Sequence, residues 1–195
     1  MISLRKPRRL SFSEYLQLEH NSETKHEFVS GYIYAMAGAS EAHNRISGNI
    51  FFHLRAAARG GGCGVFIADM KIRIEEQDRA YYPDVSVVCD PTDQDAYVKR
   101  SPCILVEVVS SSTESTDRRE KLAAYLAVPS VRYYVLASSM DRQVEYFARE
   151  DGGEWVSGNL EEGESLILRC GELRAELDLD LIYEDVLIPE SGPGG

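Results

Sequence analysis

Several motifs that mark common enzyme classes are missing from this 195-residue sequence. It has no Gly-x-x-x-x-Gly-Lys-Ser/Thr phosphate loop, no dinucleotide-binding glycine fingerprint and no His-Glu-x-x-His metal motif. The Gly-x-Ser-x-Gly elbow of many serine hydrolases is also absent. The glycines at 60–62 follow a helical pattern and close it, whereas a phosphate-binding loop would open a helix. These absences exclude the nucleotide-binding proteins and serine hydrolases that carry those motifs.

Long apolar runs and closely spaced cysteines are missing as well. The longest apolar runs are too short to span a bilayer, and the N-terminus has no apolar signal-peptide core. We therefore expect a cytoplasmic protein with no membrane partner. The four cysteines, Cys63, Cys89, Cys103 and Cys170, include no Cys-x-x-Cys pair. This spacing predicts buried reduced thiols in preference to disulfides or a zinc site.

The chain also lacks the excess positive charge of a typical nucleic-acid-binding protein. Its net charge of −11 disfavours such a partner, because attraction to phosphates drives that binding. The imbalance is local, however: residues 1–140 hold 17 acidic and 17 basic side chains, and residues 141–195 hold 15 and 4. The first part can still bind DNA through local positive patches, although its N-terminal basic cluster can equally be a solubilising tail. The candidate contacts are Arg5, Lys6, Arg8, Arg9, Arg118, Arg119 and Arg132.

What is present is a mixture of strand-like and helix-like segments with no internal repeat or linker. The length and the hydrophobic content of 44% suit one α/β domain, residues 1–190, followed by a flexible tail at 191–195. Ser11 and Glu14 form a predicted capping box for the first helix. The predicted helices are 13–19, one starting near 40 and one starting at 117, and the predicted strands are 27–29, 32–36, 65–74, 81–89, 104–109, 131–136 and 143–147, with short strands and turns beyond 151.

Two carboxylates stand in segments that otherwise favour buried strands. Asp84 precedes Val-Ser-Val-Val, and Glu107 is surrounded by Ile, Leu and Val. Acidic side chains are rarely buried unless they are paired or bound to metal, because desolvating a carboxylate is costly. Asp84 can alternatively belong to a Pro-Asp turn. Glu107 can alternatively form a structural ion pair, with Arg132 or Lys71 as the partner.

Lys121 follows these acids on the predicted helix that starts at residue 117. If the two acidic strands are neighbours, both carboxylates can converge on one Mg²⁺, which is usually held by one or two carboxylates plus phosphate oxygens. Lys121 would then orient or deprotonate a water, or bind developing negative charge. By itself a helix lysine is more commonly solvated. The order acid, acid, lysine indicates metal-dependent cleavage of a phosphodiester.

Two more residues are candidates for the same site. His43 shares the inward face of Ile46 and Ile50, where a buried histidine with satisfied hydrogen bonds is the common outcome and a site-lining group the functional one. Glu27 precedes the hairpin turn, where a charge is by default exposed to solvent. Hydroxyls at 110–113 can contact a phosphate or belong to a plain loop.

An ordered set of motifs over about residues 10–185 resembles the Uma-two family of restriction-endonuclease-like proteins, within the PD-(D/E)XK nuclease superfamily. The matching segments are His26-Glu27-Phe28-Val29-Ser30-Gly31, Met36, His43, Pro83-Asp84, Val106-Glu107-Val108-Val109-Ser110, Asp117-Arg118-Arg119-Glu120-Lys121 with Tyr125, and Val131-Arg132-Tyr133-Tyr134.

The resemblance implies a restriction-endonuclease-like core, with a central mixed β-sheet flanked by helices and an N-terminal helix and hairpin. It also implies homodimers and a divalent metal at Asp84 and Glu107. Lys121 would be the catalytic lysine, Glu27 a helper acid and further metal ligand, and His43 a residue lining the site.

The sequence departs from this pattern at a few positions. The superfamily's lysine stands two residues after the glutamate, where this chain has Val109, so Lys121 must substitute from the helix. Tyr134 replaces a more usual Trp, and Val128-Pro129 replaces a Gly-Val turn. These last changes concern packing and a helix end, not the metal site.

Our first hypothesis is therefore a Mg²⁺- or Mn²⁺-dependent DNA endonuclease. The second is a non-catalytic regulatory or interaction module on a nuclease-like fold, which the acidic C-terminal segment supports. The third is a metal-dependent phosphoesterase acting on RNA or nucleotides, which the sequence does not separate from the first.

Overall fold

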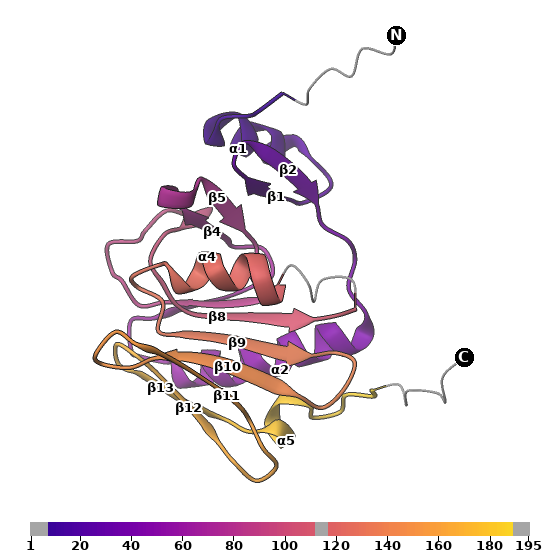
Figure 1. Cartoon of the computed structure of the whole chain (residues 1–195), viewed down its shortest axis with the longest axis vertical. Helices are drawn as coiled ribbons and strands as arrows, with labels where there is room; N and C mark the ends of the chain where they lie inside the picture. Colours follow the sequence, from indigo (N-terminus) through magenta and orange to yellow (C-terminus); the bar gives the residue numbers. More distant parts are fainter. Residues whose placement is uncertain (1–7, 112–116, 189–195) are drawn as a thin grey trace.

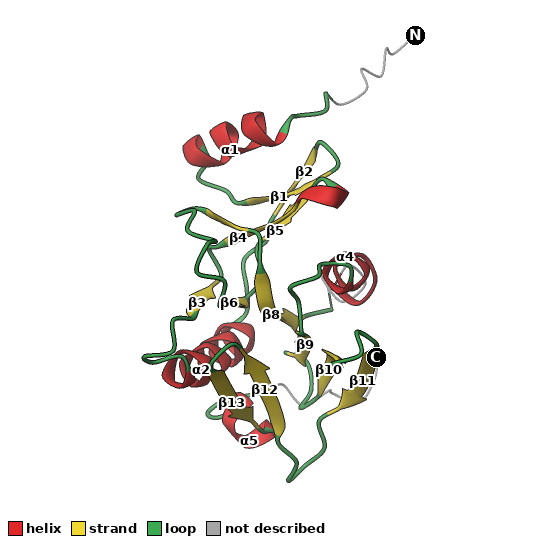
Figure 2. Cartoon of the chain, turned by 90° about the vertical axis from the view of Figure 1, so that its left-hand side faces the viewer, coloured by secondary structure: helices red, strands yellow, loops and turns green. Residues whose placement is uncertain are grey.

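The strands of the chain are arranged in a six-stranded sheet, a five-stranded sheet and a two-stranded hairpin. The computed structural model describes residues 8–111 and 117–188. Figures 1 and 2 show the five-stranded sheet with helix α1 at one end of the molecule and the hairpin with helix α5 at the other. The six-stranded sheet lies between them.

The six-stranded sheet has the order β11-β10-β9-β8-β6-β3. Strand β8 runs parallel to β9 and antiparallel to β6, so the sheet is mixed. All eight residues of β8 are buried, which confirms the central, nearly all-apolar strand predicted around residues 104–109. The strands are β3 (Gly64–Ile67), β6 (Val85–Val88), β8 (Pro102–Val109), β9 (Tyr133–Ser138), β10 (Val144–Arg149) and β11 (Trp155–Asn159).

The five-stranded sheet carries the N-terminal hairpin and is covered by α1 (Phe12–Asn21). The predicted capping box is confirmed, since the Ser11 hydroxyl accepts from the Glu14 N–H while the Glu14 carboxylate accepts from the Ser11 N–H. Phe28 packs with Tyr15 and joins helix to sheet. The strands, in sheet order, are β2 (Tyr32–Ala35), β1 (His26–Val29), β5 (Arg79–Tyr81), β4 (Lys71–Ile74) and β7 (Val98–Lys99), and a 3₁₀ turn covers Glu75–Gln77.

The two faces of the six-stranded sheet are covered by different elements. Helix α2 (Glu41–Ala57) packs on one face, together with α5 (Leu179–Ile182) and the hairpin of β12 (Leu166–Cys170) and β13 (Leu173–Leu177). Helix α4 (Leu122–Leu126), preceded by a π-helical turn at Asp117–Lys121, packs on the other face. The fold is therefore the predicted one, a mixed sheet flanked by helices with an N-terminal helix and hairpin.

Two predicted strands are wrong in their extent. Residues 65–74 and 81–89 each divide into two short strands that belong to different sheets. The first breaks where Ala68 adopts a left-handed conformation with φ of 54°, and its N–H donates to the Asp84 carbonyl. The second breaks at Pro83, which has no N–H to donate to a ladder. Asp84 consequently lies at the junction between the sheets and not within a strand.

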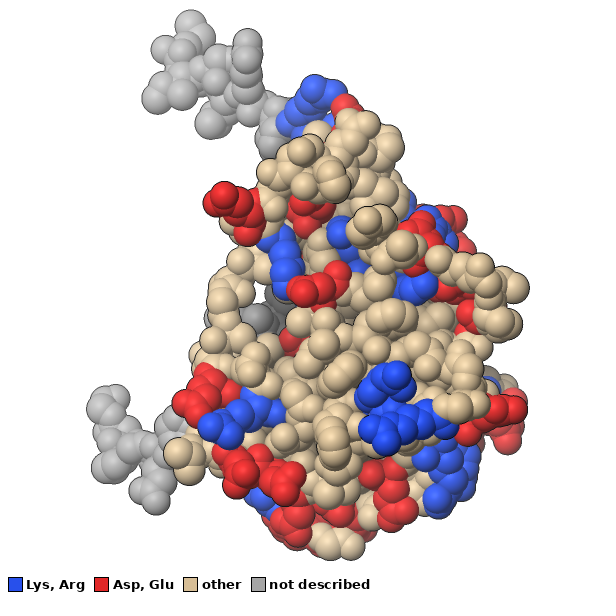
Figure 3. Space-filling model, turned by 180° about the vertical axis from the view of Figure 1, so that it is seen from behind, with Lys and Arg blue, Asp and Glu red and all other residues tan. Residues whose placement is uncertain are grey.

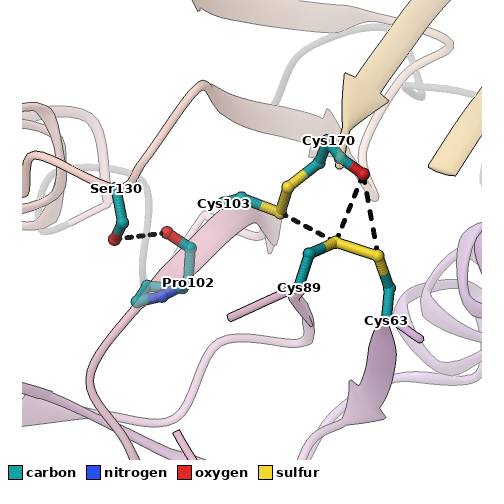
Figure 4. Close-up of a disulfide and its surroundings, with 6 residues drawn as sticks. All are labelled: Cys63, Cys89, Pro102, Cys103, Ser130 and Cys170. Atoms are coloured by element: carbon teal, nitrogen blue, oxygen red, sulfur yellow. Dashed lines mark hydrogen bonds between the residues drawn. A yellow bond between two sulfur atoms is a disulfide. The ribbon is translucent and has the colours of Figure 1, made fainter. Parts of the chain in front are cut away.

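The prediction of reduced thiols is also contradicted. Cys63 is bonded to Cys89, and Cys103 to Cys170, so all four cysteines are paired in disulfides. Figure 4 shows the two disulfides side by side. The spacing did not reveal them, because each pair joins residues that are distant in sequence and meet only when the sheet has formed.

Some predictions fall outside the described residues, namely those on Arg5, Lys6, Ser112, Thr113 and the tail at 191–195. Among the helices of the described ranges, none combines the length and apolar character needed to cross a bilayer. Figure 3 shows acidic side chains, with basic ones among them, at the end of the molecule formed by the β12–β13 hairpin and α5.

Candidate active site

Glu107 lies near the end of β8 and is buried, with 4% of its surface exposed. Because side chains alternate along a strand, Glu107 shares the face of Leu105 and Val109, which belong to the core beneath α4. Its Oε1 atom lies 3.1 Å from Lys121 Nζ and accepts a hydrogen bond of 3.1 Å from the Tyr125 hydroxyl. The ion partner of Glu107 is therefore Lys121, and not Arg132 or Lys71.

Lys121 joins Glu107 to a second acid. Its Nζ atom lies 2.9 Å from Glu27 Oε1, and only 6% of the residue is exposed. The alternative of a solvated helix lysine is thus wrong. Lys121 ends the π-helical turn that precedes α4, one turn before Tyr125, so both side chains point to the same carboxylate. Single π-helical turns are frequent at functional sites.

Glu27 comes from the other sheet, on strand β1. Its side chain is largely buried, so the default of a solvent-exposed strand-edge charge is wrong. Oε1 is fully buried and accepts no hydrogen bond of acceptable geometry, although Lys121 Nζ is within ion-pair distance. The two sheets thus place one acid on each side of the same ammonium group.

Asp84 and His43 form a second pair beside the first. Asp84 Oδ2 accepts a hydrogen bond of 2.6 Å from the Val108 N–H, which ties the junction of the two sheets to β8. His43 lies in the first turn of α2, and its Nε2 atom is 3.2 Å from Asp84 Oδ2. The Nδ1 atom of His43 is buried without a hydrogen-bond partner. The common outcome for a buried histidine, with both nitrogens satisfied, is not observed.

All five predicted site residues line one pocket of about 510 Å³. The segment between β2 and α2, residues 36–40, forms another wall, and in Figure 1 it runs past the end of β8. The structure therefore brings together residues from both sheets, from α2 and from the turn before α4. The lining residues are Glu27, Tyr34, Ala35, Met36, Ala37, Gly38, Ala39, Ser40, His43, Tyr82, Asp84, Glu107, Val108, Ser110 and Lys121.

Two tyrosines of the site were not predicted as functional. Tyr125 was expected only in the core, yet burial and the nearby Glu107 raise its pKa well above the usual range, so it remains a donor. Tyr82 lines the pocket and donates a hydrogen bond of 2.6 Å to Glu19 Oε2. Burial raises the pKa of the Tyr82 hydroxyl, and this hydrogen bond raises it further. Glu19 Oε1 lies 2.8 Å from His26 Nδ1. The four-residue spacing from Lys121 to Tyr125 was the available signal; no such signal marks Tyr82.

The donor set is suited to a hard divalent cation. Mg²⁺ and Mn²⁺ prefer carboxylate and water oxygens, and Asp84, Glu107 and Glu27 offer them at the pocket wall. Within the described ranges, these three acids are not gathered so tightly that one oxygen from each lies within 4.8 Å of the others. An ion held by two of the carboxylates, water and phosphate does not need the third carboxylate within that distance.

Three of the basic side chains predicted to contact nucleic acid have carboxylate partners. Arg118 pairs with Glu145, and Arg8 pairs with Glu14. Arg132 lies 3.4 Å from Asp151. A phosphate would have to compete with these carboxylates.

Comparison with known proteins agrees with this architecture. Residues 12–181 match the sequence model of the Uma2 family, described as "Putative restriction endonuclease". Two uncharacterized proteins of Synechocystis sp. are similar to the chain. One, slr1290, is 36% identical over 176 residues, covering 90% of this chain and 92% of its own length. The other, sll1609, is 31% identical over 150 residues, covering 75% and 85%.

A solved structure shares the fold. It is described as a putative nuclease belonging to DUF820 from Anabaena variabilis, and it superposes with a TM-score of 0.72 over 91% of this chain and 99% of its own. Its sequence identity is 14%, so the likeness concerns the fold alone.

Proposed function

The chain belongs to the Uma2 family, and from this membership and the geometry of the pocket we propose that it is a Mg²⁺- or Mn²⁺-dependent DNA endonuclease. The observation that carries the proposal is the buried Lys121 ammonium held between Glu27 and Glu107, beside Asp84 and His43. Burying such a cluster of charges is costly. If these residues had only a structural role, apolar side chains of similar size would stabilise the fold equally well.

Asp84 and Glu107 would hold the divalent ion at the wall of the pocket. The ion would lower the pKa of a bound water molecule and would stabilise negative charge on the phosphate oxygens. The N–H of Val108 fixes the Asp84 carboxylate, and the Tyr125 hydroxyl fixes that of Glu107, so neither acid has to reorganise when substrate binds.

Lys121 would bind the negative charge that develops on the phosphate. Its Nζ is aimed by two carboxylates, so its position is set before substrate arrives. Glu27 would hold Lys121 in place, and its role as a further metal ligand stays a prediction. His43 would line the pocket and orient Asp84.

The DNA substrate is proposed because the family description names a restriction endonuclease and because residues 1–140 carry no net charge. Acidic side chains are present at the end formed by the β12–β13 hairpin and α5 (Figure 3). The pocket lies away from that end, where the two larger sheets meet. Homodimerisation stays a prediction.

The test is nicking of supercoiled plasmid with Mg²⁺ or Mn²⁺, followed by removal of the ion with a chelator. Glu107→Gln, Asp84→Asn and Lys121→Met should each lower the nicking rate by at least about 100-fold, because each removes a group acting directly on the reaction. The matched control is Lys99→Met, since Lys99 is also buried but lies outside the pocket and donates to the Asp93 carbonyl. Its nicking rate should match the unmodified chain.

Two results would contradict this proposal. Cleavage of RNA or nucleotides but not DNA, lost in the same variants, would assign the site to the other phosphoesterase class. No cleavage of any nucleic acid with either ion, in folded protein, would favour the non-catalytic module.

A further inference from the structure

A second cluster of chemically reactive side chains lies outside the pocket. Cys63 precedes β3, Cys89 follows β6, Cys103 belongs to β8 and Cys170 ends β12. The sulfurs of Cys89, Cys103 and Cys170 all lie within 4.8 Å of one another, and Cys63 is bonded to Cys89. Figure 4 shows the four side chains directed to one point from four strands or strand ends.

An irregularity in β8 turns Cys103 toward this cluster. Val87 pairs with Ile104 and Val88 with Pro102, so Cys103 is the extra residue of a β-bulge. By simple alternation Cys103 would share the face of Leu105 and face away from the cluster. Instead it packs in the core on the α2 side, as Ile104 does. Bulges commonly redirect a side chain in this way.

The surroundings are closed and belong to the apolar core on the α2 side of the sheet. Cys63, Cys103 and Cys170 are buried, and the Cys170 carbonyl lies 3.3 Å from the sulfur of Cys89 and 3.6 Å from that of Cys63. At Gly171 an added Cβ would stand 3.3 Å from Cys89 Cβ, so the hairpin backbone closes directly over the sulfurs. Such closure is typical of structural metal sites, which leave no position for substrate.

We propose that the four cysteines, when both disulfides are reduced, bind one Zn²⁺ as a tetrathiolate site. Zinc bonds to sulfur are about 2.3 Å long, so sulfurs in a tetrahedral site stand about 3.8 Å apart. The sulfurs of Cys89 and Cys103, which are not bonded to each other, are 3.7 Å apart. Thiolate ligands select zinc over Mg²⁺, so this site is distinct in chemistry from the carboxylate pocket. The spacing suits one ion and is too small for a multi-iron cluster.

The chemistry of loading balances as follows. Each disulfide takes two electrons and two protons from a cellular dithiol, which becomes a cyclic disulfide, and yields two thiols. Zinc binding then releases one proton from each of the four thiols and leaves a site with a net charge of −2. Oxidation of the four thiolates by a disulfide oxidant reverses the process and releases the ion.

The first test compares oxidised protein with protein reduced anaerobically by tris(2-carboxyethyl)phosphine, because dithiols themselves bind zinc. Reduced protein should take up about one Zn²⁺ or Co²⁺ per chain, and the cobalt form should show thiolate-to-metal charge transfer and tetrahedral d–d bands. Oxidised protein should take up none at this site. In the unmodified chain, bound zinc should also protect all four thiols from alkylation.

Variants identify the ligands. Cys103→Ser should lower zinc affinity by more than about 100-fold, since even residues behind the ligands contribute 10- to 100-fold. The control is the double variant Asp84→Asn with Glu107→Gln, which should keep the cobalt spectrum unchanged. Reduced protein that binds no zinc while all four thiols alkylate freely would overturn the proposal. Zinc uptake that survives Cys103→Ser and is lost in the double carboxylate variant would overturn it too.

Discussion

The two ends of strand β8 carry opposite kinds of chemistry. Cys103 stands near its start and Glu107 near its end, about 13 Å apart at the usual rise of a strand. The Glu107 end opens into a polar pocket and holds carboxylates around an ammonium group. The Cys103 end is closed, and four sulfurs meet there within the apolar core.

The difference shows how each kind of side chain is tolerated in a core. A buried carboxylate needs a charged partner or a metal, because desolvation of the ion is expensive. Lys121 is that partner, and it is supplied by a separate helix. A neutral sulfur is buried at little cost, so the cysteines need only proximity. One strand can therefore serve both sites, with the bulge at Cys103 separating their faces.

The largest expected effect is at the sulfur end. Reducing both disulfides in the presence of EDTA should lower the free energy of unfolding by about 4–8 kcal/mol, since each bridge typically contributes about 2–4 kcal/mol by restricting the unfolded chain. The bridges close separate loops, with sequence separations of 26 and 67 residues, so their contributions should add. Urea unfolding with and without the phosphine measures this.

In a separate assay with Mg²⁺, without chelator or denaturant, nicking should be unchanged by reduction of both disulfides, because no cysteine lines the pocket. A parallel loss of nicking in folded, reduced protein would show that the two ends of β8 are coupled. An unchanged urea midpoint would contradict the contribution assigned to the bridges.

A smaller effect is expected at the carboxylate end. Lys121→Ala should destabilise the protein by about 3–5 kcal/mol at neutral pH, because it leaves the buried acids Glu27 and Glu107 without their shared cation. Adding Glu107→Gln to that variant should restore part of the loss, and urea unfolding of the complete double-mutant cycle measures the coupling. Lys99→Ala, which removes a buried lysine bonded to a neutral carbonyl, should cost less. Equal losses in both lysine variants would argue against a charge-specific role.

The smallest effect concerns how tightly the hairpin covers the sulfurs. Gly171 has φ of 55°, and Gly171→Ala should cost about 1–2 kcal/mol, the usual penalty of a left-handed residue with a Cβ. Gly163→Ala is the matched control, since Gly163 also has a positive φ, of 80°, but open space around it. Thermal unfolding of the two variants measures the difference, and equal midpoints would show that the closure over Cys89 is loose.

Much of the fold could be predicted because its signals are local. The capping box at Ser11 and Glu14, the apolar stripe of α2 and the apolar run of β8 each depend on residues close in sequence. The broken strands could not be predicted, because β propensity continues through Ala68 and only the competition between two sheets makes the chain turn there.

Residue type and order predicted Asp84, Glu107 and Lys121 and made His43 a candidate, while the family resemblance supplied the role of Glu27. The structure brings all five to one pocket. Their contacts were not predictable. How the two sheets pack decides that Glu27 and Glu107 share Lys121. It also decides that Asp84 lies at a junction, where the Val108 N–H donates to its carboxylate.

By itself the sequence determined that acids stand where apolar residues are expected, that a lysine follows them, and that the four cysteines are far apart. These facts follow from composition and local pattern. Only the tertiary structure decided which groups share a partner, because pairing depends on distances between segments far apart in the chain, 94 residues in the case of Glu27 and Lys121. It also decided that the dispersed cysteines form one cluster, since a single bulge in β8 turns Cys103 to the face where the other three lie.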